Sequence, residues 1–192
     1  MYQQVTTYIR ERAIVPDEAL EKAFGYSRMV RYRKGDYILR AGEYCPFLAF
    51  LNTGLIMVTI TDDAGKEIVC TFFFEDAFFT YIESIKDNIP SHKNFIAMED
   101  CEVLLLNKSD LPTIFSIHPA FETVFNQCIL DDLHRMIRYA QDRQTQSVEE
   151  RYLNMITTHP VLFDRVPLKF IAGYLGVAPP SLSRLRKRLV KK

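Results

Sequence analysis

Hydroxyl and basic side chains gather near the C-terminal end of this chain, and their chemistry suits a polyanionic partner. Arginine forms two hydrogen bonds at once to a phosphate or to guanine O6 and N7, and serine hydroxyls bind phosphates. A helix that carries both residue types on its outer side is typical of a DNA-contacting surface. The candidate DNA-contacting residues are Lys169, Ser181, Ser183, Arg184, Lys187 and Arg188.

The distribution of charge supports the same interpretation. Residues 164–192 contain eight Lys or Arg and one acid, Asp164, which gives this segment a net charge of +7. The whole chain has a net charge of zero, so residues 1–163 carry −7. The plainer alternative is a basic tail that only keeps the protein in solution. An asymmetry of this kind favours a segment that faces a polyanion.

Other kinds of chemistry find little support in the residue types. The four cysteines, Cys45, Cys70, Cys101 and Cys128, form no CxxC pair, so we expect reduced and mostly buried thiols rather than a zinc or iron–sulfur site. The β-rich region contains one histidine, His92, whereas a metal-dependent enzyme on a cupin-like barrel needs an HxH pair with a further Glu and His. We therefore expect no metal and no enzymatic activity. Haem binding stays open, although none of the four histidines, His92, His118, His134 and His159, stands out as a ligand.

The localisation follows from two further observations. No window approaches the roughly 18 consecutive apolar residues of a transmembrane helix. The N-terminal residues are charged where a secretory signal peptide needs an apolar run. We expect a cytoplasmic protein without a membrane partner.

The elements that position these residues follow from the periodicity. Residues 1–28 contain two short helical patterns, and from Met29 to about Asn107 short β-type runs are separated by turn signals around Gly35, Gly42, Gly54 and Gly65. This spacing predicts an antiparallel sandwich or roll. Residues 95–107 read as a further pair of strands around a polar Glu–Asp turn.

A long helix is predicted to follow Pro119. Its apolar residues recur every three or four positions: Phe121, Phe125, Ile129, Leu133, Met136 and Ala140. This stripe either folds back on the β unit or pairs with the same helix of a second subunit. The polar run 141–146 predicts a hinge, and Ser147 with Glu150 forms a capping box that starts a new helix.

Two short helices with a tight turn are predicted after Pro167. Gly176 ends the first helix, and Pro179 and Pro180 restart the chain as a second helix. Leu182, Leu185 and Leu189 give this second helix an inward face. The pattern predicts a helix-turn-helix, which usually works as a dimer.

Two segments carry a resemblance to a known family. "YRKGDYILRAGEYCPFLAFLNTGLIMV" and "VPLKFIAGYLGVAPPSLSRLRKRL" resemble the Crp/Fnr superfamily of bacterial transcription regulators, and the C-terminal segment is most similar to members common in Bacteroidetes-type bacteria. The resemblance implies an α+β fold: an antiparallel, cupin-like β-roll (a double-stranded β-helix) with flanking helices, a long dimerisation helix and a C-terminal helix-turn-helix domain. The implied domains are a cyclic-nucleotide-binding-like sensor at 1–118, a dimerisation helix and hinge at 119–145, and a DNA-binding domain at 146–192.

The resemblance also implies two sites, and this chain departs from the family at both. The recognition helix would span residues 180–189, but Pro179 and Pro180 replace the Glu that often sets operator preference. A tentative effector pocket would involve Tyr81, Glu83, Ser91, His92 and Lys93. The arginine of the cyclic-AMP cassette has no counterpart, because the chain contains no Arg between Arg40 and Arg135. Cyclic AMP, another small effector and a ligand-free pocket all stay open as alternatives, and no cofactor is certain.

The implied function is transcription regulation, with a signal in the roll changing the spacing of two recognition helices. The implied partners are double-stranded DNA, a second copy of the chain in a homodimer, and RNA polymerase. The alternative is a sensor module that acts through a protein partner without binding DNA.

Overall fold

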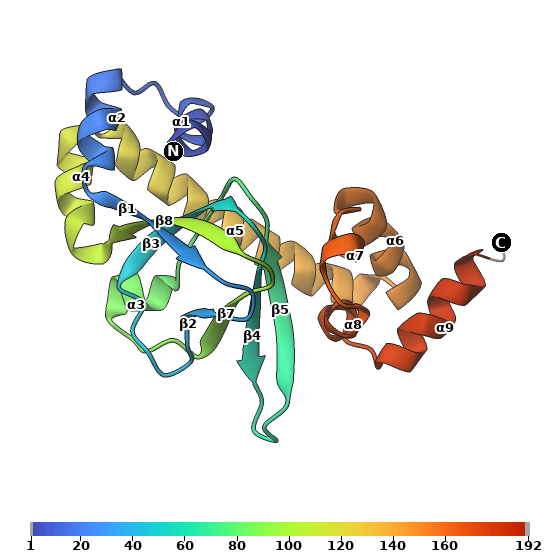
Figure 1. Cartoon of the computed structure of the whole chain (residues 1–192). Helices are drawn as coiled ribbons and strands as arrows, with labels where there is room; N and C mark the ends of the chain where they lie inside the picture. The colour runs from blue at the N-terminus through green and yellow to red at the C-terminus, as the bar shows by residue number, and fades with distance from the viewer. Residues whose placement is uncertain (1, 191–192) are drawn as a thin grey trace.

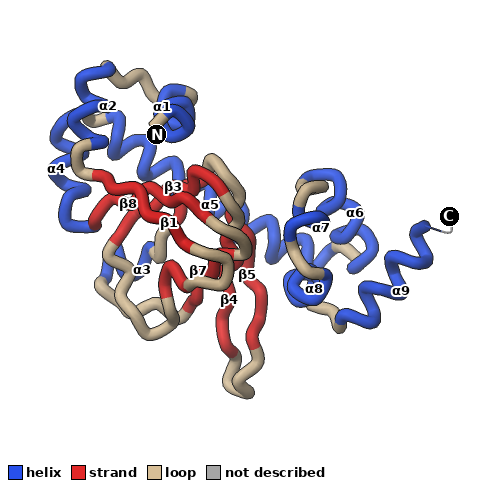
Figure 2. The backbone as a smooth tube through the Cα atoms, viewed as in Figure 1, coloured by secondary structure: helices blue, strands red, loops and turns tan. Residues whose placement is uncertain are grey.

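The computed structural model describes residues 2–190, which form a β-roll, a long helix and a group of C-terminal helices (Figures 1 and 2). Two four-stranded antiparallel sheets make the roll, with strand orders β1-β8-β3-β6 and β2-β7-β4-β5. The predicted antiparallel roll is confirmed. Its strands are β1 (Ser27–Tyr32), β2 (Tyr37–Leu39), β3 (Phe47–Thr53), β4 (Ile56–Thr61), β5 (Glu67–Phe73), β6 (Ala77–Phe79), β7 (Lys93–Ala97) and β8 (Cys101–Asn107).

The strands β7 and β8 do not pair with each other, although they are adjacent in the sequence. The strand β7 pairs with β2 and β4, whereas β8 pairs with β1 and β3 in the other sheet. The chain crosses between the sheets at residues 98–100, next to Gly54, which has a φ of 105°. A Cβ at Gly54 would lie 2.9 Å from the Asp100 carbonyl oxygen, so only glycine fits this crossing. The prediction that residues 95–107 form two strands is therefore right about the strands, but the prediction that the two strands pair with each other is wrong.

Helices cover the outer face of the β1-β8-β3-β6 sheet. Val5 of α1 (Gln3–Arg10), Leu20 of α2 (Asp17–Phe24) and Ile114 of α4 (Leu111–Ile117) are buried in one cluster with Phe50 and Leu104 of the sheet. The Gln4 Nε2 amide also donates to the Asn52 carbonyl oxygen at 2.8 Å. Two short helices complete this half, α3 (Ile82–Asp87) and the 3-10 helix η1 (Lys108–Asp110).

The long helix α5 (Ala120–Thr145) starts on the roll and leaves it (Figure 1). Phe121 and Val124 are buried against the roll, whereas the side chains of Leu133 and Met136 are 48% and 52% exposed. The helix continues through Thr145, so residues 141–145 are helical and the hinge predicted at 141–146 is wrong there. Only residue 146 lies outside the helix. A polar run without Gly or Pro contains nothing that breaks a helix.

Four helices form the C-terminal unit, which we define as residues 148–190. They are α6 (Val148–Thr158), α7 (Leu162–Arg165), α8 (Leu168–Leu175) and α9 (Pro179–Val190). The predicted capping box is confirmed at the start of α6, where Ser147 N donates to Glu150 Oε2 at 2.8 Å and Glu150 N donates to Ser147 Oγ at 3.2 Å. Among residues 2–190, no helix has the length and apolarity that a membrane span requires.

Candidate functional site

The helices α8 and α9 are joined by a tight turn that fixes their relative orientation. Gly176 ends α8 with a φ of 73°, a left-handed conformation that favours glycine. The backbone N–H groups of Ser181 and Leu182 both donate to the Ala178 carbonyl oxygen, so α9 begins at Pro179. Proline fits there because its nitrogen has no hydrogen to leave unpaired. Both predicted helices and the turn between them are confirmed.

The helix α9 has one buried apolar face and one exposed polar face. Leu182 and Leu185 are buried in a cluster that contains Tyr152 of α6 and Ile171 of α8. In a helix, residues three and four apart share a face, which places Ser181, Arg184, Lys187 and Arg188 together on the outer side. All four are exposed, and Ser183 beside them is half-buried. In Figure 1, α9 lies at the end of the molecule away from the roll.

Two of the candidate DNA-contacting residues have neighbours within the chain. Arg188 forms an ion pair with Glu149 of α6, although 61% of its side chain is exposed. Lys169 is exposed, and its Nζ atom lies 4.7 Å from the centre of the Phe170 ring. Arg184 and Lys187 are exposed, and neighbouring Arg186 is exposed as well.

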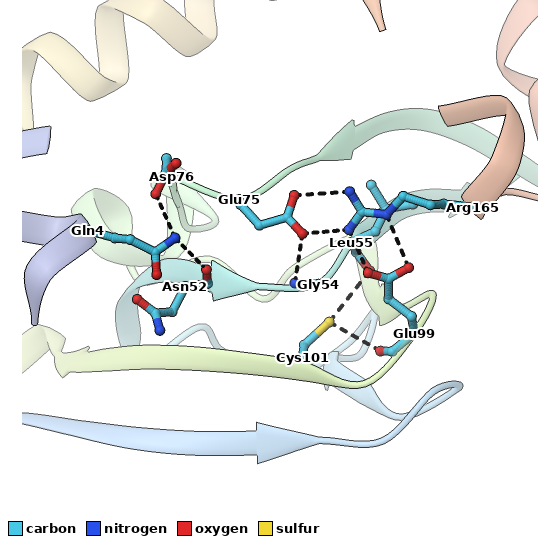
Figure 3. Close-up of polar contacts among 9 residues, drawn as sticks. All are labelled: Gln4, Asn52, Gly54, Leu55, Glu75, Asp76, Glu99, Cys101 and Arg165. Atoms are coloured by element: carbon cyan, nitrogen blue, oxygen red, sulfur yellow. Dashed lines mark hydrogen bonds and ion pairs between the residues drawn. The ribbon is translucent and has the colours of Figure 1, made fainter. Parts of the chain in front are cut away.

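One cation of the basic segment points inwards and is mostly shielded from solvent. Arg165, at the end of α7, is directed towards the roll and lies between Glu75 and Glu99 (Figure 3). Its guanidinium donates to both Glu75 oxygens at 2.6 and 3.0 Å, and to both Glu99 oxygens at 2.5 and 3.2 Å. Glu75 also accepts the backbone N–H of Gly54 at 3.0 Å. We call this arrangement of Arg165, Glu75 and Glu99 the clamp.

The clamp perturbs the protonation of its members. Burial alone would raise the pKa of Glu75, but the hydrogen bond from Arg165, together with backbone N–H groups including that of Gly54, lowers it overall. The hydrogen bonds that Arg165 donates to Glu99, and then those that it donates to Glu75, raise the pKa of Arg165. Both shifts favour the charged forms, so Glu75 and Arg165 are ionised at neutral pH.

The clamp predicts a pH dependence of stability. A carboxylate whose pKa is lowered on folding contributes stability above its unfolded value of 4.5 and loses it as the pH falls below that value. We expect the difference in unfolding free energy between the wild type and Glu75→Gln to be constant near neutral pH. It should shrink below pH 4.5, as measured by urea denaturation. A difference that does not change with pH would contradict the ionised clamp.

Apolar packing joins the C-terminal unit to the roll beside the clamp. Leu55, Met57 and Val69 of the roll share a buried cluster with Ile171 and Leu175 of α8. A Cβ at Gly173 would lie 3.3 Å from the Val69 Cγ2 atom, so α8 approaches β5 closely. The Tyr139 hydroxyl of α5 donates to the Tyr174 carbonyl oxygen at 2.7 Å. The orientation of α8, and with it α9, is thus set by the roll and by α5.

The five tentative effector residues lie together at the junction of α3 and β7. The Tyr81 hydroxyl lies 2.6 Å from His92 Nδ1, and the Lys93 Nζ atom lies 5.8 Å from the centre of the Tyr81 ring. Ser91 is buried and its hydroxyl donates to the Lys93 carbonyl oxygen at 2.9 Å. Burial, and then the charge of Glu83, raises the pKa of Tyr81. These contacts hold α3 and β7 together.

The interior of the roll is filled by aromatic rings. The ring centres of Phe73, Phe79 and Phe95 lie 5.6 to 6.3 Å from one another. A small cavity of about 170 Å³ remains between the roll and α5, bordered by Phe73, Phe79, Ile129 and Met136 among others. Ligand pockets usually measure about 300–1,000 Å³, and none of the five tentative effector residues borders this cavity.

The cysteines and acids offer little for metal chemistry. Cys45 and Cys101 are buried, Cys70 and Cys128 are half-buried, and all four thiols are free. Burial raises the pKa of Cys70, Cys101 and Cys128, which keeps these thiols protonated. Within residues 2–190 there is no group of three or more His, Cys, Asp or Glu side chains that could hold a metal ion.

Comparison with known proteins agrees with this architecture. Residues 29–118 match the family described as the cyclic nucleotide-binding domain. The structure resembles FixK2 from Bradyrhizobium japonicum with a TM-score of 0.73 and 16% identity, covering 86% of this chain and 85% of FixK2. It resembles a regulator of the Crp/Fnr family from Eubacterium rectale with a TM-score of 0.73 and 15% identity, covering 92% and 85%.

A third similar structure is the c-di-GMP-responsive global regulator CLP from Xanthomonas campestris. Its TM-score is 0.68 at 18% identity, and the alignment covers 92% of each chain. At these identities the likeness shows the fold alone, an antiparallel β-roll with flanking helices. None of the curated proteins matches the chain.

Proposed function

We propose that this protein is a DNA-binding transcription regulator of the Crp/Fnr type. In this proposal α8 and α9 form a helix-turn-helix, and α9 enters the major groove with Arg184 and Lys187 directed at the DNA. The observation that carries it is the outer face of α9, which is basic, exposed and held by a buried inner face and the Gly176 turn. A helix with these properties matches the dimensions and charge of the major groove.

The proposal divides the chain into three domains. Residues 1–118 form the sensor domain, residues 119–145 the dimerisation helix, and residues 146–192 the DNA-binding domain. A dimer is supported by the part of α5 that leaves the roll. There the apolar side chains of Leu130, Leu133, Met136 and Ile137 are between 44% and 52% exposed. Neighbouring apolar side chains of this size usually mark a protein interface.

The dimer predicts the effect of a charge within this stripe. Leu133→Asp should weaken dimerisation by about tenfold or more, because the new carboxylate would be buried without a partner. Analytical ultracentrifugation measures the association. Leu153→Asp is the matched control, because Leu153 of α6 is similarly exposed at 45% but lies off the stripe. Equal dimerisation of both variants would contradict the assignment of α5 as the dimer helix.

Coupling in this proposal runs through the docked orientation of the C-terminal unit. The clamp and the contact of Gly173 with Val69 tie α8 to the roll, and the Tyr139 hydroxyl ties α8 to α5. A shift of α5 or β5 would therefore move both recognition helices of a dimer. Such a shift changes the populations of DNA-compatible and incompatible dimers.

The proposal excludes cyclic AMP as the effector. The interior of the roll is filled by Phe73, Phe79 and Phe95, and the region between Arg40 and Arg135 offers no guanidinium for the phosphate. We expect cyclic AMP to leave the thermal unfolding temperature unchanged in differential scanning fluorimetry. A saturable rise of this temperature with cyclic AMP would show that the roll opens and accepts it.

The proposed function is tested by electrophoretic mobility with DNA from the region upstream of the protein's own gene. We expect a retarded complex that contains two protein chains and resists an excess of unrelated DNA. If the protein instead acts through a protein partner, no retarded complex forms. RNA polymerase is a further proposed partner, tested by adding it to the same complex.

A further inference from the structure

Outside the roll interior, a larger recess lies where the roll, α5 and the C-terminal unit meet. It has a volume of about 650 Å³, within the usual size of a small-molecule site. Figure 1 shows α5 passing from the roll to α6 in this region. Residues from β5, α5, α6 and α8 border it, so each part of the molecule contributes to its wall. We call it the junction cavity.

Arginine dominates the polar wall of the junction cavity. Arg135 and Arg138 of α5 and Arg151 of α6 border it, against a single acid, Asp142, so the three cations and one anion leave a net charge of +2. The α5 residues Arg135, Arg138 and Asp142 recur three or four positions apart, which places them on one face of the helix. One oxygen of Asp142, Oδ1, accepts the Gln146 Nε2 amide at 2.8 Å.

The guanidinium groups of two of these arginines are incompletely paired. Among the described residues, the buried Nε and Nη1 atoms of Arg151 and the buried Nε atom of Arg135 have no hydrogen-bond partner. The Arg135 Nη2 atom pairs with Asp132 on the same helix. Buried donors without an acceptor are costly, and those on a cation most of all. Such donors beside a recess suit a bound anion, whose oxygens would accept hydrogen bonds from them.

The other walls of the junction cavity are aromatic. The rings of Phe74 and His159 are stacked at 4.8 Å, and Tyr174 lies 4.9 Å from Tyr139 and 5.7 Å from Phe72. Burial, and then the charge of Arg135, lowers the pKa of His159, so its ring is neutral at neutral pH. Rings of this kind stack on planar ligands with little preference for their substituents.

We propose that the junction cavity binds a small molecule in which a terminal phosphate group, which cyclic AMP lacks, is joined to a planar aromatic ring system. Arg151 and Arg138 hold the phosphate, and the aromatic wall takes the ring. The ligand touches β5, α5 and the C-terminal unit together, so its binding stabilises the docked orientation. This site is separate from the roll interior and from the DNA-facing side of α9.

The test uses ADP as the probe and the full chain without DNA. Isothermal titration calorimetry should show saturable binding of ADP. Adenosine, which lacks the phosphates, and inorganic pyrophosphate, which lacks the aromatic ring, should each bind about tenfold more weakly or worse. Arg151→Gln should weaken ADP binding by about tenfold or more. Arg138→Gln, at an exposed position on the rim, should weaken it in the same direction without affecting folding.

Two controls separate this site from the rest of the molecule. Arg28→Gln removes an exposed charge from β1 and should leave ADP binding unchanged. Arg184→Ala should also leave it unchanged, so failure of DNA binding and failure of ADP binding are distinguishable. An absence of saturable ADP binding, or binding that survives both Arg151→Gln and Arg138→Gln, overturns the proposal.

Discussion

Replacing Arg165 with alanine is expected to release the C-terminal unit from the roll. The guanidinium makes four hydrogen bonds to Glu75 and Glu99, and its removal leaves two carboxylates facing each other. The three side chains are 22% to 35% exposed, so solvent screens part of the loss. We expect a decrease in unfolding free energy of about 1–3 kcal/mol, measured by urea denaturation.

Hydrogen exchange identifies where that loss occurs. In Arg165→Ala the amides of α7 and α8 should exchange faster, whereas those of β3 and β8 in the roll should not change. Arg165→Lys should fall between the alanine variant and the wild type, because an ammonium keeps the charge but cannot pair with two carboxylates in a fork. As a control, Arg31→Ala removes an ion pair in which Arg31 is 83% exposed, and it should cost little. Wild-type exchange in Arg165→Ala would show that apolar packing alone holds the unit.

Replacing Arg184 with alanine is expected to weaken DNA binding by about 1–3 kcal/mol if this residue contacts a base. Arg184 is exposed on the outer face of α9, and its removal leaves the buried Leu182 and Leu185 untouched. The variant should therefore fold like the wild type. Fluorescence anisotropy with a labelled duplex measures the affinity, and competition with mutated duplexes shows whether sequence preference is relaxed.

A matched variant separates a specific contact from a change in total charge. Arg28→Ala removes the same charge from an exposed position on β1, at the other end of the molecule. It should change the affinity by much less than Arg184→Ala. Equal effects of the two substitutions would mean that Arg184 acts only through the net charge and that its assignment as a DNA contact is wrong.

Local signals in the sequence predicted the elements well. The glycines in the β region separate short apolar runs, Ser147 with Glu150 starts α6, and Gly176 with Pro179 defines the turn before α9. Each of these signals acts within a few residues, through φ preferences or capping bonds, so one sequence is enough to detect it. The exposed basic face of α9 followed from the same local spacing.

Features that depend on distant residues were not predictable in this way. Arg165 was counted among the cations of the basic segment, but it pairs with Glu75 and Glu99, which are 90 and 66 positions away. The pairing of β7 and β8 depends on the crossing at Gly54, which local periodicity does not reveal. The tentative effector residues came from the resemblance to a family cassette, and their contacts hold α3 against β7.

The most direct test of the central claim is the salt dependence of DNA binding by the wild-type chain. Each copy exposes Lys169, Arg184, Arg186 and Lys187, and a dimer presents both sets. A plot of the logarithm of the association constant against the logarithm of salt concentration should have a slope of about −4 or steeper, since each neutralised phosphate contributes about −0.9. Arg184→Ala should reduce that slope. Affinity that is absent, or that does not change with salt, would contradict the assignment of α9 as a DNA-reading helix.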